Sequence, residues 1–267
     1  MSSAGKVRIG IVQFRAYNDE PGENLERATN YIENLVEEEV DLVLLPEMFN
    51  SGYGTDETTV NNAIEMQEET VEVLSALADY NDIAIVGGMV NRKDGAVFNS
   101  TVIMLPYLEP VYYNKTHLFR DEKKAFTPGS EFRSFEYSGV SFGVLMCYEV
   151  GFPEISRKLC LNGAEILLIP FAFGRERRTI FDVATRARAI ENACFVVAAS
   201  QCGVGRSINF VGESRIVSPS GEILVDCGGA EGFASTDIDT KLVKKYRYSE
   251  TRDSHGYFSN FRDDLYR

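Results

Sequence analysis

The sequence contains no tryptophan and only two histidines, His117 and His255, among its 267 residues. No pair of cysteines or carboxylates accompanies these histidines at the spacing of zinc ligands, so we expect no metal site. A catalytic cysteine–histidine pair would have to use one of the two, and each is more typical of a hydrogen-bonded core or surface residue. The scarcity of histidine therefore argues against both a zinc enzyme and a papain-like enzyme.

Membrane-spanning, phosphate-binding and secretory patterns are missing as well. No stretch approaches the roughly 20 apolar residues of a membrane span, no glycine-rich phosphate-binding motif is present, and the residues before Val7 lack a signal-peptide pattern. A formal net charge of −13 repels phosphate backbones. The five cysteines are an odd number without close pairing, which is typical of free thiols in a reducing compartment. We expect a cytoplasmic protein that binds neither membrane nor nucleic acid and holds no cofactor.

The order of the predicted elements indicates one α/β domain. Apolar residues at spacings of three and four predict helices over 21–38, 68–80, 152–162 and 179–194. Strand-like runs lie at 7–14, 41–46, 83–90, 96–105, 109–114, 132–138, 140–146, 166–170 and 195–200. A strand meander over 208–239, a short helix over 240–246 and a polar tail complete the chain. This pattern predicts a mixed sheet system with helices outside.

Cys147 stands at the end of the apolar run 140–146 and just ahead of the predicted helix that Pro153 opens. A thiol on such a strand-to-helix turn is held rigidly, and the positive end of the following helix favours thiolate over thiol. The position suits a nucleophile. A small buried apolar residue is the alternative that this segment leaves open.

Glu47 and Lys115 also follow strand-like runs, where ligands collect in layered α/β folds. A carboxylate and an ammonium that converge on a thiol would supply a general base, an electrostatic stabiliser and a nucleophile, which acyl transfer requires. Glu122 follows closely and either joins this site or faces solvent. For Glu47 the alternative is a surface carboxylate, and for Lys115 a side chain that extends to water.

Gly139-Val-Ser141-Phe-Gly143 matches the G-x-S-x-G motif of serine hydrolases. The serine of that motif must lie on a sharp turn between a strand and a helix. Here the apolar run continues through Met146, so we expect Ser141 to lie inside a strand. The match is therefore not evidence for a serine nucleophile.

Taken together, four segments resemble the motif series of the nitrilase, or carbon-nitrogen hydrolase, superfamily. They are Leu-Leu-Pro-Glu47-Met-Phe with Ser51-Gly-Tyr53, Asn114-Lys115-Thr-His-Leu-Phe119, Glu122 ahead of Phe126-Thr-Pro-Gly129, and Cys147-Tyr-Glu-Val-Gly-Phe-Pro-Glu154. Order and spacing both agree, and the resemblance spans nearly the whole chain.

The resemblance implies a four-layer α-β-β-α sandwich and a Glu-Lys-Cys triad without a metal. Glu47 would be the general base, Lys115 the stabiliser of the tetrahedral intermediate and Cys147 the nucleophile, with the Tyr148 backbone N–H in the oxyanion site and Glu122 as the second glutamate of the family. Family members commonly form homodimers through the helices flanking the nucleophile, here 152–162 and 179–194. A single domain over 1–267 is expected, with the tail from about 247 packing on a neighbouring part or on the dimer partner.

The branch of the family decides the substrate. Nitrilases usually have tryptophan after the cysteine, so its absence argues against nitriles, and the motif lies nearer to amidases of omega-amides and amino-amides. Glu149 and Gly151 stand where omega-amidases have aspartate and arginine, and the missing positive charge argues against substrates that carry a carboxylate. The residues considered for the substrate pocket, with ordinary packing as the alternative, are Tyr53, Phe171, Phe173 and Arg175.

The main hypothesis is hydrolysis of a small aliphatic primary amide through a Cys147 thioester. Hydrolysis of an N-carbamoyl amine is the second hypothesis, a nitrilase is less favoured, and a scaffold of the same fold without turnover is the non-enzymatic alternative.

Overall fold

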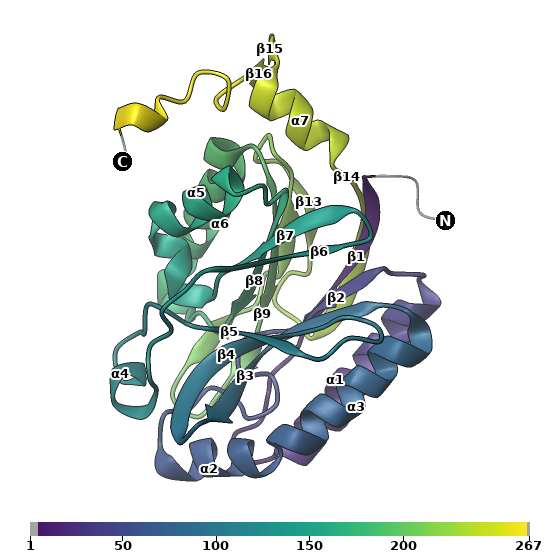
Figure 1. Ribbon diagram of the computed structural model, residues 1–267. Helices are drawn as coiled ribbons and strands as arrows, with labels where there is room; N and C mark the ends of the chain where they lie inside the picture. The colour runs from purple at the N-terminus through teal and green to yellow at the C-terminus, as the bar shows by residue number, and fades with distance from the viewer. Residues whose placement is uncertain (1–4, 266–267) are drawn as a thin grey trace.

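A computed structural model of the chain describes residues 5–265, and the terminal residues 1–4 and 266–267 lie outside this range. Two six-stranded sheets form its centre (Figure 1). The first sheet has the order β14-β1-β2-β3-β4-β5, and the second has the order β13-β12-β9-β8-β7-β6. In each sheet three strands that follow one another in space are parallel, β1–β3 in the first and β7–β9 in the second.

The strands of the first sheet are β1 (Lys6–Gln13), β2 (Leu42–Leu44), β3 (Ala84–Lys93), β4 (Ala96–Met104), β5 (Val111–Asn114) and β14 (Gly232–Asp239). Those of the second are β6 (Arg133–Tyr137), β7 (Val140–Val144), β8 (Ile166–Phe171), β9 (Phe195–Ser200), β12 (Arg215–Val217) and β13 (Ile223–Asp226). Two short ribbons pair β10 (Cys202–Val204) with β11 (Asn209–Val211) and β15 (Glu250–Thr251) with β16 (Ser254–His255).

Helices cover the outer faces of both sheets and complete the α-β-β-α sandwich (Figure 1). Helices α1 (Pro21–Glu37) and α3 (Gln67–Asn81) lie on the first sheet, and α5 (Pro153–Leu161) and α6 (Arg178–Asn192) lie on the second. Shorter helices are α2 (Glu57–Glu65), α4 (Glu122–Ala125) and α7 (Lys241–Tyr248). The 3-10 turns are η1 (Cys147–Gly151), η2 (Arg175–Arg177) and η3 (Asp263–Leu265). No helix within residues 5–265 is long and apolar enough to cross a membrane.

The two faces of β1 show how the layers are held together. Val7, Ile9 and Ile11 point into the core between the sheets, whereas Val12 belongs to the separate core under α1 and α3. Strand residues two apart share a face, so the alternation supplies both cores from one strand. Burial of apolar surface on both sides, at roughly 25 cal/mol per Å², is the main stabilising contribution to such a layered fold.

The predicted helices and strands are present with small shifts of their ends, and the structure adds two helices that periodicity did not indicate. Helix α4 is a single turn, too short to show a period. Helix α2 has nine residues and begins after Asp56, whose side chain accepts the Thr59 backbone N–H in an N-cap arrangement. Ser141 lies inside β7, as expected from the continuing apolar run.

The beginning of the C-terminal tail packs on the rest of the same chain. Arg247 donates from Nε to the Asn192 carbonyl at 3.2 Å. Phe258 lies beneath the guanidinium groups of Arg247 and Arg157, at 4.6 and 5.5 Å. This segment therefore covers α5 of its own chain, and contact with a partner remains a prediction for the tail; its last two residues lie outside the described range.

Candidate active site

The strand ends of the two sheets bring the candidate residues together. Glu47 follows β2, Lys115 follows β5 and Cys147 follows β7. Strands β3 and β4, and β4 and β5, are antiparallel, so β5 points the same way as β2 and both candidates leave the same edge of the first sheet. Because the sheets pack face to face, this edge meets the carboxyl ends of β7 and β8.

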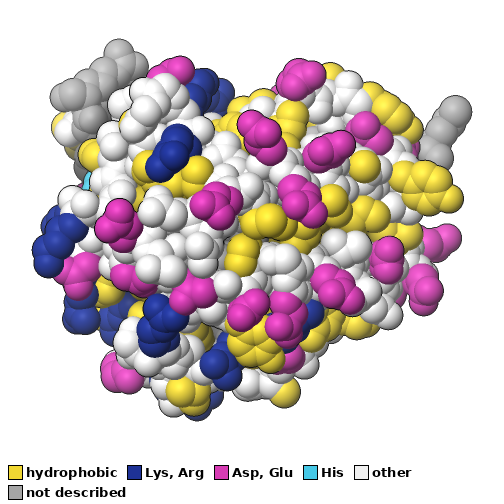
Figure 2. Space-filling view, turned by 90° about the horizontal axis from the view of Figure 1, so that it is seen from below, with side chains coloured by type: hydrophobic (Ala, Val, Ile, Leu, Met, Phe, Trp, Pro, Cys, Tyr) yellow, Lys and Arg dark blue, Asp and Glu magenta, His cyan; other side chains and the backbone are white. Residues whose placement is uncertain are grey.

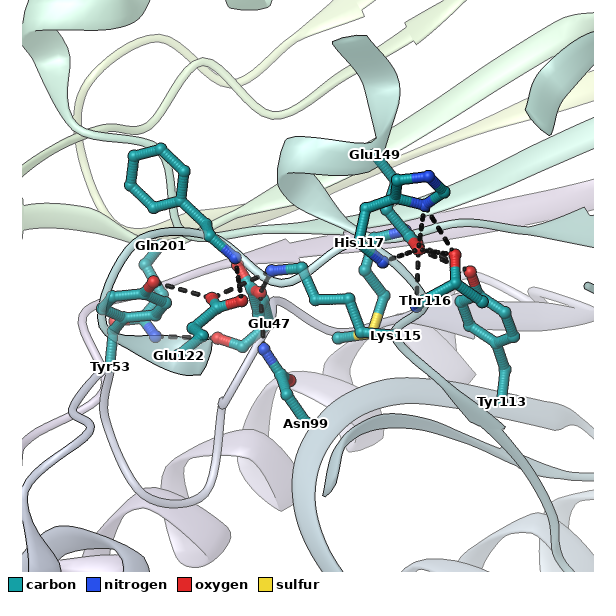
Figure 3. A network of polar contacts seen from close by, with 12 residues as sticks. Glu47, Tyr53, Asn99, Tyr113, Lys115, Thr116, His117, Glu122, Glu149 and Gln201 are labelled. Carbon is teal, nitrogen blue, oxygen red and sulfur yellow. Dashed lines mark hydrogen bonds and ion pairs between the residues drawn. The ribbon is translucent and has the colours of Figure 1, made fainter. Parts of the chain in front are cut away.

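Lys115 is held between two buried carboxylates. Its Nζ lies 2.6 Å from Oε1 of Glu47 and 2.9 Å from Oε1 of Glu122, and all three side chains are fully buried (Figure 3). Tyr53 donates its hydroxyl to the same Oε1 of Glu122 at 2.7 Å, and the Phe119 N–H donates to Oε2 at 2.8 Å. Glu122 therefore joins the site and does not face solvent.

The Cys147 thiol lies beside this ion cluster. It interacts with the carboxylate of Glu47 and with the backbone of Ala172, which follows β8, and only 4% of the residue is exposed. Its backbone has φ of +45°, a left-handed conformation that a residue other than glycine adopts at a cost.

The pKa values of the cluster are set by burial and by mutual charge. Burial and the nearby charge of Glu47 raise the pKa of the Cys147 thiol well above its usual value. Burial, together with Glu122, raises the pKa of Glu47 in spite of the opposing Lys115. Burial by itself would lower the pKa of Lys115, but Glu47 and Glu122 outweigh it and raise that pKa well above normal. The resting site thus holds a neutral thiol beside a carboxylate of enhanced basicity.

This resting state corrects the expectation that a helix end stabilises the thiolate. The residues after Cys147 form the 3-10 turn η1, and α5 begins only at Pro153. The dipole of a full helix is therefore not aimed at the sulfur, whereas the negative Glu47 is its neighbour. The Glu47 carboxylate contacts the thiol, which is where a base that accepts the thiol proton would lie.

Polar side chains from both sheets hold Glu47 in place. Asn99 donates from Nδ2 to Oε1 at 2.9 Å, and Gln201 donates from Nε2 to the Glu47 carbonyl at 2.8 Å. Gly88 permits the close approach of the backbone, since a Cβ there would lie 2.6 Å from the Glu47 Cα. Sequence reasoning did not assign Asn99 or Gln201; Gln201 follows β9, so the same strand-end rule that selected Glu47 would have found it.

Glu149 forms a second buried cluster on the other side of Lys115 (Figure 3). The Thr116 hydroxyl and the backbone N–H groups of Thr116 and His117 donate to its Oε1, at 2.6, 2.8 and 3.1 Å. The Met146 N–H donates to Oε2 at 2.8 Å, and the Tyr113 hydroxyl lies 2.8 Å from both oxygens. Glu149 thus ties the residues around Lys115 to the turn that carries Cys147.

These hydrogen bonds also determine the charge state of Glu149. Burial would raise its pKa, but the donors from His117, Thr116, Met146 and Tyr113 outweigh it and lower the pKa. Conversely, Glu149 raises the pKa of His117. Both oxygens of this carboxylate are therefore engaged by donors from two loops, so Glu149 is not a group that binds substrate.

The four residues considered for the substrate pocket do not all lie together in the structure. Tyr53 lines a pocket of about 340 Å³ with Phe119 and Glu122. Phe171 is fully buried against the rings of Phe173 and Phe181, at 5.3 and 4.9 Å, and so belongs to the core.

Arg175 does not lie with the catalytic candidates. It is exposed, and its guanidinium lies beside Gly229. The residues of η2 advance by about a third of a turn each, so Arg175 and Arg177 point in different directions. Arg177 is the one whose guanidinium lies between Phe119 and Phe173, at 4.2 and 4.4 Å from the ring centroids.

The ring of Tyr148 completes this aromatic surface. It lies 5.0 Å from the Phe119 ring and 5.2 Å from the Phe152 ring. Tyr148 is thus next to Cys147 in the chain and in contact with the loop that carries Glu122. Within residues 5–265, no three His, Cys, Asp or Glu side chains are grouped so that they could hold a metal ion.

Comparison with known proteins identifies the family of this chain. The family model described as carbon-nitrogen hydrolase matches residues 8–248. The chain belongs to the carbon-nitrogen hydrolase family. Its fold and its relatives place it in the amidase branch of the nitrilase superfamily.

The relatives of this carbon-nitrogen hydrolase include both amidases and a nitrilase. A 2-oxoglutaramate amidase of Bacillus subtilis is 33% identical over 98% of this chain and 100% of its own length. A nitrilase of Pyrococcus abyssi is 32% identical over 97% of this chain and 99% of its own. The solved structure of a cysteine-to-alanine mutant of the Nesterenkonia AN1 amidase superposes with a TM-score of 0.86 at 25% identity, over 99% of this chain and 97% of that one.

Proposed function

We propose that this carbon-nitrogen hydrolase is an amidase that converts a small aliphatic primary amide to a carboxylate and ammonia through a thioester on Cys147. The observation that carries the proposal is the buried contact of Lys115 with Glu47 and Glu122 beside the thiol. The activities for which two relatives are named, a 2-oxoglutaramate amidase and the Nesterenkonia amidase, support an amide as substrate. All five cysteines are free, which fits the cytoplasmic location that we also propose.

In the first half of the reaction Glu47 takes the proton of the Cys147 thiol, and the sulfur attacks the amide carbonyl carbon. The carbonyl π bond opens, and the negative oxygen is stabilised by the ammonium of Lys115 and by the backbone N–H of Tyr148. Burial strengthens this stabilisation because water does not screen the charges.

The intermediate then loses ammonia. Glu47 returns its proton to the departing nitrogen, the C–N bond breaks, and an acyl thioester remains on Cys147. A water molecule then gives a proton to Glu47 while its oxygen attacks the thioester carbonyl carbon. The C–S bond breaks, Glu47 returns the proton to the sulfur, and the carboxylic acid leaves as carboxylate after it loses its proton to solvent. Glu122 keeps the Lys115 ammonium charged and in place throughout, since both of its oxygens are engaged by groups of the site.

Hydrolysis of an N-carbamoyl amine is the alternative that the same residues can perform. It would release carbon dioxide together with ammonia and an amine, whereas a simple amide releases ammonia and a carboxylate without carbon dioxide. A scaffold without turnover is disfavoured because such a protein gains nothing from a buried Lys115 with two carboxylates, an arrangement that is costly to desolvate.

The test is ammonia release from a panel of aliphatic amides, N-carbamoyl amines and nitriles by the wild type and by Cys147→Ala. We expect the wild type to act on amides, and the variant to lose more than about a thousandfold of that rate because the nucleophile is gone. Cys227→Ala, at a half-buried cysteine outside the cluster, is the matched control.

Mass spectrometry of the wild type with a slow amide should show the acyl group on Cys147. Full activity in Cys147→Ala would contradict the proposed mechanism. Carbon dioxide release from N-carbamoyl amines, with no action on amides, would favour the alternative.

A further inference from the structure

The guanidinium of Arg177 lies between two aromatic rings that border the active site. It stacks against Phe119 and Phe173, and the residue is half-buried. Stacking of this kind engages the faces of the guanidinium and leaves the N–H groups at its edge available for hydrogen bonds. The stem of the side chain is thus held in place while its donors remain unused.

Within the described residues 5–265, no carboxylate or carbonyl pairs with this guanidinium. Three other arginines in this part of the structure do have acidic partners. Arg178 binds Glu213 at 2.5 Å, Arg215 binds Asp182 at 2.6 Å, and Arg206 pairs with Asp19. In a chain with a net charge of −13, a partly buried arginine that has no acidic partner calls for another explanation.

Both rings that hold Arg177 belong to segments that touch the catalytic groups. The Phe119 N–H donates to Glu122, and Phe119 lines the 340 Å³ pocket together with Tyr53 and Glu122. Phe173 follows Ala172, whose backbone contacts the Cys147 thiol. Arg177 therefore stacks on one ring that lines the pocket and on another that follows the backbone neighbour of the Cys147 thiol.

We propose that Arg177 determines specificity by binding a carboxylate at the far end of the acyl half of the substrate. The inference rests on the proposed amidase function and narrows its substrate class to monoamides of short dicarboxylic acids. The in-plane N–H groups of a guanidinium match the two oxygens of a carboxylate, whereas a plain aliphatic chain has no hydrogen-bond acceptor for them. Arg177 thereby supplies, from another segment, the positive charge that Gly151 lacks in the motif after Cys147.

The test compares kcat/KM for succinamate and glutaramate with that for butyramide and valeramide, which are uncharged and of similar length. We expect the wild type to prefer the charged amides. Arg177→Met keeps an apolar stem between the two rings and removes the charge. Loss of a charge-assisted hydrogen-bond pair should reduce the ratio of charged to uncharged kcat/KM by about 10–100-fold, mostly through KM for the charged amides.

Two further variants separate charge from packing. Arg177→Lys retains a cation without the planar fork and should keep part of the preference. Arg175→Met removes an exposed arginine two residues away and should leave the ratio as in the wild type. Thermal melting of each variant checks that the fold is retained.

A wild type that prefers the uncharged amides would overturn this inference. It would also be overturned by an Arg177→Met variant whose kcat/KM falls equally for charged and uncharged amides. The second outcome is what a purely packing role of Arg177 produces. In either case the proposed amide hydrolysis by the wild type would still stand. The proposed function itself would be overturned if the wild type released no ammonia from any amide tested.

Discussion

At the scale of single residues, the site depends on a balance among four buried ionisable groups. Lys115 carries a positive charge between Glu47 and Glu122, and the thiol of Cys147 stays protonated because a further negative charge there would face Glu47. Buried ion pairs add little or nothing to stability after desolvation, so stability alone does not explain this cluster. Removal of any one charge leaves its partners uncompensated.

The raised pKa of Glu47 predicts the acid limb of the pH–rate profile. Glu47 accepts a proton only when ionised, so kcat/KM should rise with pH through a pKa clearly above the usual carboxyl value of about 4.3. Lys115 has a raised pKa and remains charged over this range.

The measurement is kcat/KM from about pH 4 to pH 9 for the wild type and for Glu47→Gln. The variant should lose on the order of 10²–10⁴ in rate, and its remaining activity should no longer show this limb. Glu136→Gln, at an exposed carboxylate on β6, should behave like the wild type. An acid limb near the ordinary carboxyl value would show that Glu47 is not the base.

At the scale of elements, two loops have to keep their relative position within a fraction of an ångström for catalysis. The loop after β5 carries Lys115, and the turn after β7 carries Cys147. Glu149 joins them, with donors from Thr116 and His117 on one side and from Met146 on the other. Glu149 is therefore a positioning residue, and it acts through the groups that it holds.

Glu149→Gln should lower the free energy of unfolding at pH 7 by about 2–4 kcal/mol, because the amide NH₂ would face backbone donors. The folded-state pKa of Glu149 is lowered, so its stabilisation is complete above the unfolded-state value of about 4.3 and is lost as pH falls through the folded value. The variant should therefore lose less stability on acidification than the wild type.

Urea denaturation at about pH 7 and pH 4 measures both effects, again with Glu136→Gln as the control. Activity distinguishes positioning from simple destabilisation: in the folded variant kcat should fall more than KM changes, and Glu149→Asp should recover part of it. Equal acid sensitivity in variant and wild type would refute the assigned charge state.

At the scale of the whole molecule, acidic side chains and exposed apolar side chains are distributed in different ways over the surface. On the face seen in Figure 2, acidic side chains are scattered among apolar ones without gathering in one patch. On the opposite sheet, α5 and α6 pack on each other and carry exposed apolar side chains, namely Leu161, Ile180, Val183 and Ile190. We propose that these two helices form the contact of a homodimer.

Val183→Glu should therefore convert a dimer to a monomer, because the residue is 58% exposed on α6 and a charge would be buried at the contact. Size-exclusion chromatography with light scattering at micromolar concentration measures the change. Tyr80→Glu, on the distant helix α3, should leave the dimer intact. A wild type that is monomeric under these conditions would contradict the proposal.

The sequence by itself determined the elements of this protein and the positions of its three candidate catalytic residues along the chain. Apolar periodicities of two and near 3.6 distinguish strands from helices wherever a segment is long enough, and Glu47, Lys115 and Cys147 could be found because each follows a strand. The single turn α4 and the capped α2 were missed, since a period does not show in four residues and a cap is a local signal.

Only the tertiary structure decided which strand ends meet, and with that the charge states and the neighbours of each group. The roles of Glu149 and Arg177 and the raised pKa values of Glu47 and Cys147 arise from contacts between residues far apart in the chain or from the direction of a tight turn. The sequence alone does not distinguish Arg175 from Arg177, because both are arginines in the same short segment. The 3-10 turn that carries them exposes one and places the other between two rings at the border of the pocket.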